Sequence, residues 1–253
     1  MSEDRGDDSA YVAWKGWVYE TPFAELSRGE KQYFAAEVRK VVGAGLPIRD
    51  VLEVGYGNGA FLAFGRSQGW TMSGTELDAD LVAAGKAAGF EVYPADQLGS
   101  FADQSFDLIA LFDVLEHIPQ DDIVGFLELL VRKLRRGGRI ILRFPNADSW
   151  LGNPMQYGDP THVTAIGYLK MTYFALQSSL EIVSFTGARR HGFATSLAHG
   201  IYGITVGPLL RLGAEIQRIV LFPSLPIVLY ASNIVCVVRV RVPVRVRVRV
   251  REK

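Results

Sequence analysis

The sequence predicts an α/β fold with a doubly wound, mostly parallel sheet, and three observations lead to this prediction. Between residues 51 and 144, short runs rich in β-branched and apolar residues alternate with segments of helical periodicity. The first of these runs passes directly into a loop with alternating glycines, Gly55, Gly57 and Gly59. With 253 residues, 49% of them hydrophobic, the chain can bury one large core. We therefore expect one domain over residues 1–253.

The predicted elements follow one another in a regular order. Apolar residues at helical spacing predict a first helix from Phe23 to Val41, which the stretch "GAGLP" ends. Expected strands cover residues 51–54, 70–75, 90–93, 106–112 and 139–144, and expected helices cover residues 60–67, 79–88 and 122–136. The last of these helices carries basic residues at the negative end of its dipole and stops at Gly137 and Gly138.

The pattern changes after residue 144. A helix is expected over residues 165–177 and a strand over residues 180–185. The division that we expect is an amino-terminal arm and helix (1–45), a cofactor-binding core (46–188), an apolar insertion or lid (189–230), the last strand (231–242) and a basic tail (243–253). The tail alternates arginine and valine, and we expect it to be a frayed, low-complexity end.

Composition argues against several classes of function. The 27 basic residues balance the 27 acidic ones, so no nucleic-acid partner is expected. Cys236 is the single cysteine and cannot form an internal disulfide, and no cysteines and histidines have zinc-site spacing. The acidic start "MSEDRGDDSA" lacks the apolar stretch of a secretory signal peptide, which predicts a cytoplasmic location.

The glycine loop lies where a buried strand turns into a helix, so the backbone can bend sharply and approach a ligand closely. Gly55, Gly57 and Ala60 fit a dinucleotide-binding fingerprint, and Glu76 ends the second strand at nearly the expected distance. The loop by itself therefore leaves more than one nucleotide cofactor open. Glu53, inside the apolar strand, is costly to bury unless a polar or cationic group meets it, which favours a cationic ligand.

Two further motifs narrow the choice. The fourth strand ends in "FDVLEHIP", and the fifth follows within "KLRRGGRIILRFPN". With the glycine loop and Glu76, the chain resembles the class I S-adenosylmethionine-dependent methyltransferases, strongly over residues 51–146, although Arg136 replaces the usual proline of the last motif. The resemblance implies a Rossmann-like sheet of seven strands in the order 3-2-1-4-5-7-6, with the last strand antiparallel, and S-adenosyl-L-methionine as cofactor.

The resemblance also implies a role for each matching residue. At the methionine end of the cofactor, the backbone of the three loop glycines would flank the ligand and Glu53 would face its ammonium group. Phe112 and Asp113 would close that end. At the nucleoside end, Glu76 would accept hydrogen bonds from the ribose hydroxyls. The remaining implied contacts are those of Asp96 with the adenine amino group and of Gln97 beside the ring.

A sulfonium methyl group is already activated, so its transfer needs alignment, exclusion of water and removal of a proton from the acceptor. His117 follows the fourth strand, where open α/β sheets place their ligands, and is the first candidate for the base. His162, in "YGDPTHV", is the second. Asp113, Glu116 and His117 also resemble a divalent-ion patch of some small-molecule O-methyltransferases, but an adjacent Glu-His pair is a weak signal and we predict no metal.

We expect methylation of an oxygen atom on a small molecule, a glycan or a lipid-linked intermediate. One alternative is an NAD-dependent oxidoreductase, which the glycine loop and Glu76 favour but "FDVLEH" does not. The other is a non-catalytic protein that binds a cofactor or associates with a membrane.

The apolar insertion suggests a partner for the protein. Residues 196–230 carry only Arg211, Glu215 and Arg218 as charges, more apolar surface than a compact domain readily buries. We expect a helix at residues 209–222 that either lies against the inner face of a membrane, with its arginines at headgroup level, or serves as a lid or homodimer contact.

Overall fold

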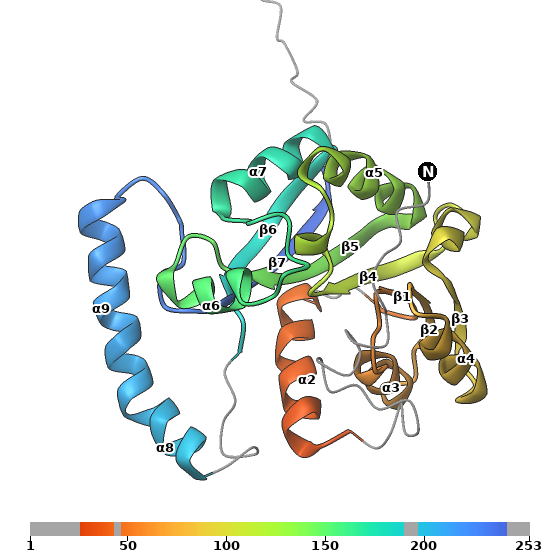
Figure 1. Cartoon of the computed structure of the whole chain (residues 1–253), viewed down its shortest axis with the longest axis horizontal. Coiled ribbons are helices and arrows are strands. Elements are labelled where there is room, and N and C mark those ends of the chain that lie inside the picture. Colours follow the sequence, from red (N-terminus) through yellow and green to blue (C-terminus); the bar gives the residue numbers. More distant parts are fainter. Residues whose placement is uncertain (1–25, 43–46, 190–196, 242–253) are drawn as a thin grey trace, which may run out of the picture.

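The computed structural model describes residues 26–42, 47–189 and 197–241, which form a seven-stranded sheet with helices on both faces (Figure 1). The strand order is β3-β2-β1-β4-β5-β7-β6. Strands β1 to β5 run parallel, and β7 is antiparallel to both β5 and β6. The strands are β1 (Asp50–Val54), β2 (Thr71–Glu76), β3 (Glu91–Pro94), β4 (Phe106–Phe112), β5 (Leu134–Pro145), β6 (Leu180–Gly187) and β7 (Asn233–Val240). The predicted fold class, strand order and antiparallel last strand are confirmed.

Side-chain hydrogen bonds cap the starts of α2 and α4. Ser27 and Glu30 form reciprocal hydrogen bonds between their side chains and backbone N–H groups at the start of α2, and Asp78 accepts from the N–H of Leu81 at the start of α4. The helices are α2 (Arg28–Val42), α3 (Ala60–Ser67), α4 (Ala79–Ala87), α5 (Ile123–Lys133), α6 (Asn153–Tyr157), α7 (Tyr168–Gln177), α8 (Leu197–Ile204) and α9 (Val206–Leu221), with 3₁₀ turns η1 (Ala95–Ser100), η2 (Leu115–His117), η3 (Gln120–Asp122) and η4 (Trp150–Gly152).

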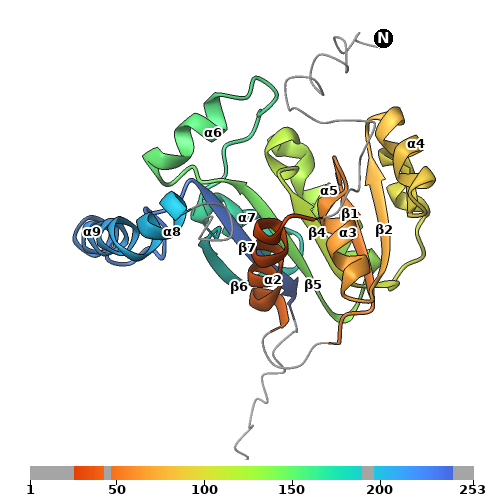
Figure 2. The same cartoon turned by 90° about the horizontal axis from the view of Figure 1, so that it is seen from below.

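The apolar core lies on both faces of the sheet, and Figure 2 looks onto the face that α2 and α3 cover. On one face, Leu127 of α5 and Phe174 of α7 pack against β4, β5 and β7. On the other, Phe34 of α2 and Phe61 of α3 pack against β1 and β2. Because both faces are covered, the central strands are almost wholly apolar, and a charged residue within them stands out.

The end of α5 differs from the sequence prediction. The helix stops at Lys133 rather than Arg136, and Leu134 already pairs with Phe106 in the sheet. The ammonium of Lys133 is buried and donates to the carbonyl oxygens of Gly99 and Phe101, at 2.9 and 2.5 Å. These contacts tie Lys133 to the segment around η1, so its charge serves the entry of β5 rather than a longer helix.

Other boundaries shift by a few residues. β2 and β3 each begin one residue later than predicted, α7 begins at Tyr168 instead of residue 165, and β6 extends to Gly187. In the insertion, the expected helix at residues 209–222 is α9, which begins earlier at Val206 and is preceded by α8. Most of the arm, residues 190–196 and the basic tail lie outside the described residues. The division of the chain into these parts stays a prediction.

Candidate functional site

The carboxyl ends of β1, β2 and β4 meet at one edge of the sheet, and the glycine loop leaves β1 at this edge. Gly55, Gly57 and Gly59 all have positive φ angles, of 67°, 53° and 72°. L-residues with side chains rarely adopt this left-handed conformation. A Cβ atom on Gly55 would also lie 2.7 Å from Cγ2 of Val114, so the loop needs glycine there for space as well as for backbone geometry.

Glu76 connects this loop to the end of β2. One carboxylate oxygen accepts a hydrogen bond from the N–H of Gly57 at 2.8 Å, and the other accepts from the N–H of Leu77 at 2.7 Å. Burial raises the pKa of Glu76 from its usual value, although these backbone donors work in the opposite direction. A carboxylate has about four lone-pair sites, so Glu76 can hold the loop and still accept hydrogen bonds from a ligand.

Glu53 lies in β1 just before the loop and is only 3% exposed. Burial, followed by the charge of nearby Glu76, raises its pKa well above the usual value of 4.5. The backbone N–H of Leu62 stabilises its charged form, but within the part of the chain that the structure describes Oε2 of Glu53 has no hydrogen-bond partner. A buried acceptor left in this state is suited to a polar or cationic ligand group.

Replacing Glu53 with glutamine should change how stability depends on pH. Because its folded-state pKa is raised, Glu53 contributes stability below pH 4.5, which is lost as the pH rises through the raised pKa. Glutamine has no charge to bury, so the variant should gain about 1 kcal/mol or more at pH 8 relative to the parent, with little gain at pH 4. Thermal unfolding at the two pH values measures this difference. An equal change in stability at both pH values would contradict the raised pKa of Glu53.

Asp96 and Gln97 lie in η1, directly after β3, with both side chains exposed. β3 pairs with β2 so that Pro94 is the register partner of Glu76. Asp96 comes two residues after Pro94, so it lies at the same edge of the sheet as Glu76. The contacts of Asp96 and Gln97 with the adenine ring stay a prediction.

Phe112 and Asp113 make contacts within the protein itself. The ring of Phe112 packs against the rings of Phe34 and Phe61, with centroids 5.6 and 5.0 Å apart. Asp113 has a positive φ of 59°, and its carboxylate binds the guanidinium of Arg143 through two hydrogen bonds. These contacts support a structural role, whereas the predicted contacts with a cofactor stay a prediction.

Sequence reasoning missed the partners of Asp113. Arg143 lies in β5, and besides Asp113 it donates to the hydroxyl oxygen of Tyr33 in α2 at 2.9 Å. This network anchors α2 against the site edge of the sheet. The available signal was an arginine within the apolar strand "IILRFP", because a charge in such a strand needs a partner just as Glu53 does.

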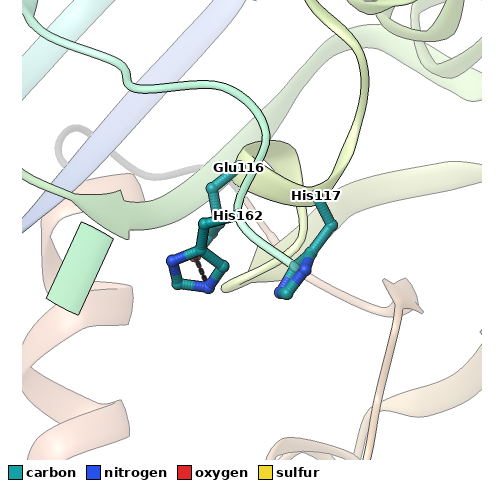
Figure 3. A group of neighbouring side chains, drawn as sticks. All are labelled: Glu116, His117 and His162. Atoms are coloured by element: carbon teal, nitrogen blue, oxygen red, sulfur yellow. Dashed lines mark ion pairs between the residues drawn. The ribbon is translucent and has the colours of Figure 1, made fainter. Parts of the chain in front are cut away.

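The two predicted histidines are brought together by loops that follow different strands. The backbone N–H groups of Val163 and Thr164 both donate to the carbonyl oxygen of Glu116, at 2.9 and 3.0 Å, which ties the loop after β5 to η2 after β4. Figure 3 shows the rings of His117 and His162 projecting side by side, and their centroids are 4.6 Å apart. Residues 45 positions apart in the sequence thus form one cluster.

The environments of the two histidines differ. Nδ1 of His117 lies 3.2 Å from the carbonyl oxygen of Thr161 and 3.0 Å from its hydroxyl oxygen. A proton on Nδ1 would satisfy the carbonyl oxygen and leave a lone pair on Nε2. His162 is more enclosed, with 6% of its side chain exposed, and its Nε2 lies 3.3 Å from a carboxylate oxygen of Asp159. His117 therefore has the better arrangement for a base that exchanges protons with a ligand.

Glu116 joins the two histidines to form a group that can hold a metal ion. One ligand atom from each residue lies within 4.8 Å of the others, and Glu116 is fully buried. Imidazole and carboxylate groups are ligands that several divalent metals accept. The sequence led us to expect no metal, and the cluster makes a direct test of metal dependence worthwhile.

A cavity with a volume of about 560 Å³ lies elsewhere in the described part of the chain. It is lined by Lys31, Gln32, Ala35 and Arg39 of α2, Phe64 and Ser67 of α3, and by Gln68 and Arg189. None of the predicted site residues contributes to it.

Comparison with known proteins bears on this geometry. A family model described as "Methyltransferase domain" matches residues 26–189, from the start of α2 to the end of β6. No functionally curated protein matches the sequence.

Solved structures share the fold at low sequence identity. A SAM-dependent methyltransferase from Archaeoglobus fulgidus is 19% identical, with a TM-score of 0.61, over 87% of this chain and 99% of the other. An S-adenosylmethionine-dependent methyltransferase from Clostridium acetobutylicum is 10% identical, with a TM-score of 0.56, over 92% and 100%. A protein from Thermotoga maritima described as a possible histamine N-methyltransferase is 15% identical, with a TM-score of 0.55, over 92% and 96%.

The residues that the family model matches include the glycine loop, Glu53, Glu76 and "FDVLEH". The sheet has the strand order that the resemblance to class I methyltransferases implies. The family match confirms the family that the motifs indicate: the chain belongs to the methyltransferase domain family.

Proposed function

We propose that the protein transfers a methyl group from S-adenosylmethionine to an oxygen atom of a small molecule, a glycan or a lipid-linked intermediate. The observation that carries the proposal is the pair of buried acids, Glu53 and Glu76, around a glycine loop in the left-handed conformation. A nucleoside with a cationic methionine group matches both features, because one acid suits hydroxyl donors and the other suits an ammonium group.

The residues present fit this cofactor. Glu53 has a buried oxygen atom without a hydrogen-bond partner in the described part of the chain, and it would hold the amino group. Glu76 would accept from the ribose, and Asp96 and Gln97 would hold the base. S-adenosylmethionine, when bound, supplies a methyl group that is already activated by its sulfonium.

The protein then has to orient the acceptor, exclude water and take a proton from the acceptor hydroxyl. Nε2 of His117 is suited to accept this proton, because Thr161 can hold the proton of the ring on Nδ1. His162 and Asp159 pack beside it and would restrict the orientation of the ring. The base is the feature that favours an oxygen acceptor, since a hydroxyl group must lose its proton for transfer to be completed.

The loops after β5 present exposed aromatic groups. Trp150 in η4 and Tyr157 in α6 are 74% and 75% exposed. Such amphipathic rings suit a sugar or another ring system as well as the polar boundary of a lipid layer. These groups support an acceptor larger than a simple metabolite.

Calorimetry with S-adenosylmethionine and NAD⁺ tests the cofactor assignment. We expect S-adenosylmethionine to bind with a Kd on the order of micromolar, which is usual for enzyme ligands. NAD⁺ should show no binding at about 1 mM. Release of labelled methyl into a cell extract then separates an enzyme from a non-catalytic binding protein. Binding of NAD⁺ alone would overturn the proposal and favour the oxidoreductase alternative.

A further inference from the structure

Helix α9 has its polar face turned toward the rest of the chain and its apolar face turned outward. None of its sixteen residues is buried. Successive helical residues are about 100° apart, so Arg211, Glu215 and Arg218 share an arc of about 60°. The residues that are partly covered lie on or beside this arc, and they are Gly207, Ala214, Glu215 and Arg218. This arrangement is the reverse of a helix that packs on a core.

The charges on this arc are used within the chain. Arg218 binds the carboxylate of Glu215 at 2.9 Å and donates to the carbonyl oxygen of Leu225 at 3.3 Å. The guanidinium of Arg211 lies over the ring of Tyr230, 4.6 Å from its centroid. The sequence led us to expect these arginines at the level of lipid headgroups. The structure instead directs them toward the segment that leads into β7.

The outward face is aliphatic over an arc of about 200°. Its exposed residues are Val206, Leu209, Leu210, Leu212, Ile216, Ile219, Val220 and Leu221, and α8 continues the surface with Leu197, Ile201 and Ile204. Gln217 is the one polar residue within the arc. Figure 1 shows α8 and α9 in line with each other at the edge of the molecule, away from the sheet. A contiguous apolar surface of this kind marks an interaction site.

We propose that the outward face of α8 and α9 inserts into the apolar boundary of a lipid bilayer. No described helix is long and apolar enough to cross a membrane, and α9 has a length of about 24 Å, so the helices would lie in the plane of the surface. Insertion through this face needs only aliphatic side chains, since the chain itself satisfies the polar side of the helix.

A lipid partner fits this face better than a second copy of the chain. Protein interfaces are enriched in aromatic residues and arginine and carry about one hydrogen bond per 100–200 Å². The outward face has neither aromatic rings nor charges to set the register of a partner, and its arc is wider than the stripe of about 100° that one packed helix face covers. A hydrocarbon layer covers such an arc without any register.

The inserted helices would bring the site edge close to the bilayer. The segment after α9 is held by the loop after β5, because Ser149 donates to the carbonyl oxygen of Leu229 and Asn146 donates to those of Val228 and Ala231. The exposed Trp150 directly follows Ser149. A short segment therefore connects the apolar face to the loops that carry the aromatic groups. This arrangement suits a lipid-linked acceptor.

Flotation of the full chain with vesicles of phosphatidylcholine alone tests the proposal. We expect the protein to float with the vesicles equally at 0.1 and 0.5 M NaCl, because the outward face carries no charge that salt can screen. Leu212→Glu/Ile219→Glu should reduce flotation more than tenfold. The matched control is Leu169→Glu/Leu176→Glu on α7, since these residues are exposed to 58% and 53%, against 59% and 56% for the tested pair, and it should float as the parent does.

Calorimetry with S-adenosylmethionine verifies that each variant is folded. Because it measures cofactor binding separately from flotation, it also distinguishes a failure of the membrane proposal from a failure of the proposed function. The membrane proposal is overturned if the parent does not float or if the α7 control loses flotation equally. It is also overturned if light scattering shows a parent dimer that the α9 variant converts to a monomer, with no flotation of either. That last result would assign the face to a second copy of the chain.

Discussion

Replacing His117 with alanine is expected to lower turnover about a hundredfold or more, the usual contribution of a general base. Affinity for S-adenosylmethionine should stay nearly unchanged, because the predicted cofactor contacts are made by the glycine loop, the buried acids and η1 and not by His117. Transfer of labelled methyl into a cell extract measures turnover, and calorimetry measures affinity.

His162→Ala is the matched control, because its ring lies 4.6 Å from that of His117 but is enclosed beside Asp159. A smaller loss of turnover is expected from it. Full turnover in His117→Ala would show that the acceptor is positioned without this base. If chelation by EDTA abolishes turnover, a divalent ion restores it, and both histidine variants lose it equally, then Glu116 and the two histidines bind a metal instead.

Replacing Glu76 with alanine should weaken binding of S-adenosylmethionine by about 1.5–3 kcal/mol, or about 10- to 150-fold. The variant loses charge-assisted acceptors for the ribose. It also releases the N–H of Gly57, which Glu76 holds at 2.8 Å, so the glycine loop loses one of its supports. Calorimetry on the folded variant measures the change, with thermal unfolding to confirm that the fold is kept.

Glu91→Ala provides the control for this change. Glu91 begins β3 and accepts a hydrogen bond from the hydroxyl of Ser73 at 3.2 Å, at the opposite end of the strands from the site. Its replacement should leave affinity within about twofold, a difference of about 0.4 kcal/mol. Unchanged affinity in Glu76→Ala would remove Glu76 from the cofactor site.

Much of the fold could be predicted because its elements carry local signals. The strands of the core are short apolar runs, and Gly55, Gly57 and Gly59 mark the turn into α3 at positions where the structure shows positive φ angles. The error at the end of α5 has a specific cause. The basic residues from Lys133 to Arg136 look like the last turn of a helix, but the helix ends at Lys133, whose ammonium is bound by carbonyl groups at the end of η1 and directly after it; no local pattern contains that information.

The sequence by itself determined the fold class, the glycine loop and the identity of the acids and histidines at the strand ends, because hydrophobic periodicity and backbone requirements act over a few residues. Only the tertiary structure decided which side chains meet. It placed His162 beside His117, bound Asp113 to Arg143, and turned the charges of α9 inward so that its aliphatic face lies outside. Contacts of this kind depend on how distant segments pack, and a helix can bury either face until its neighbours are in place.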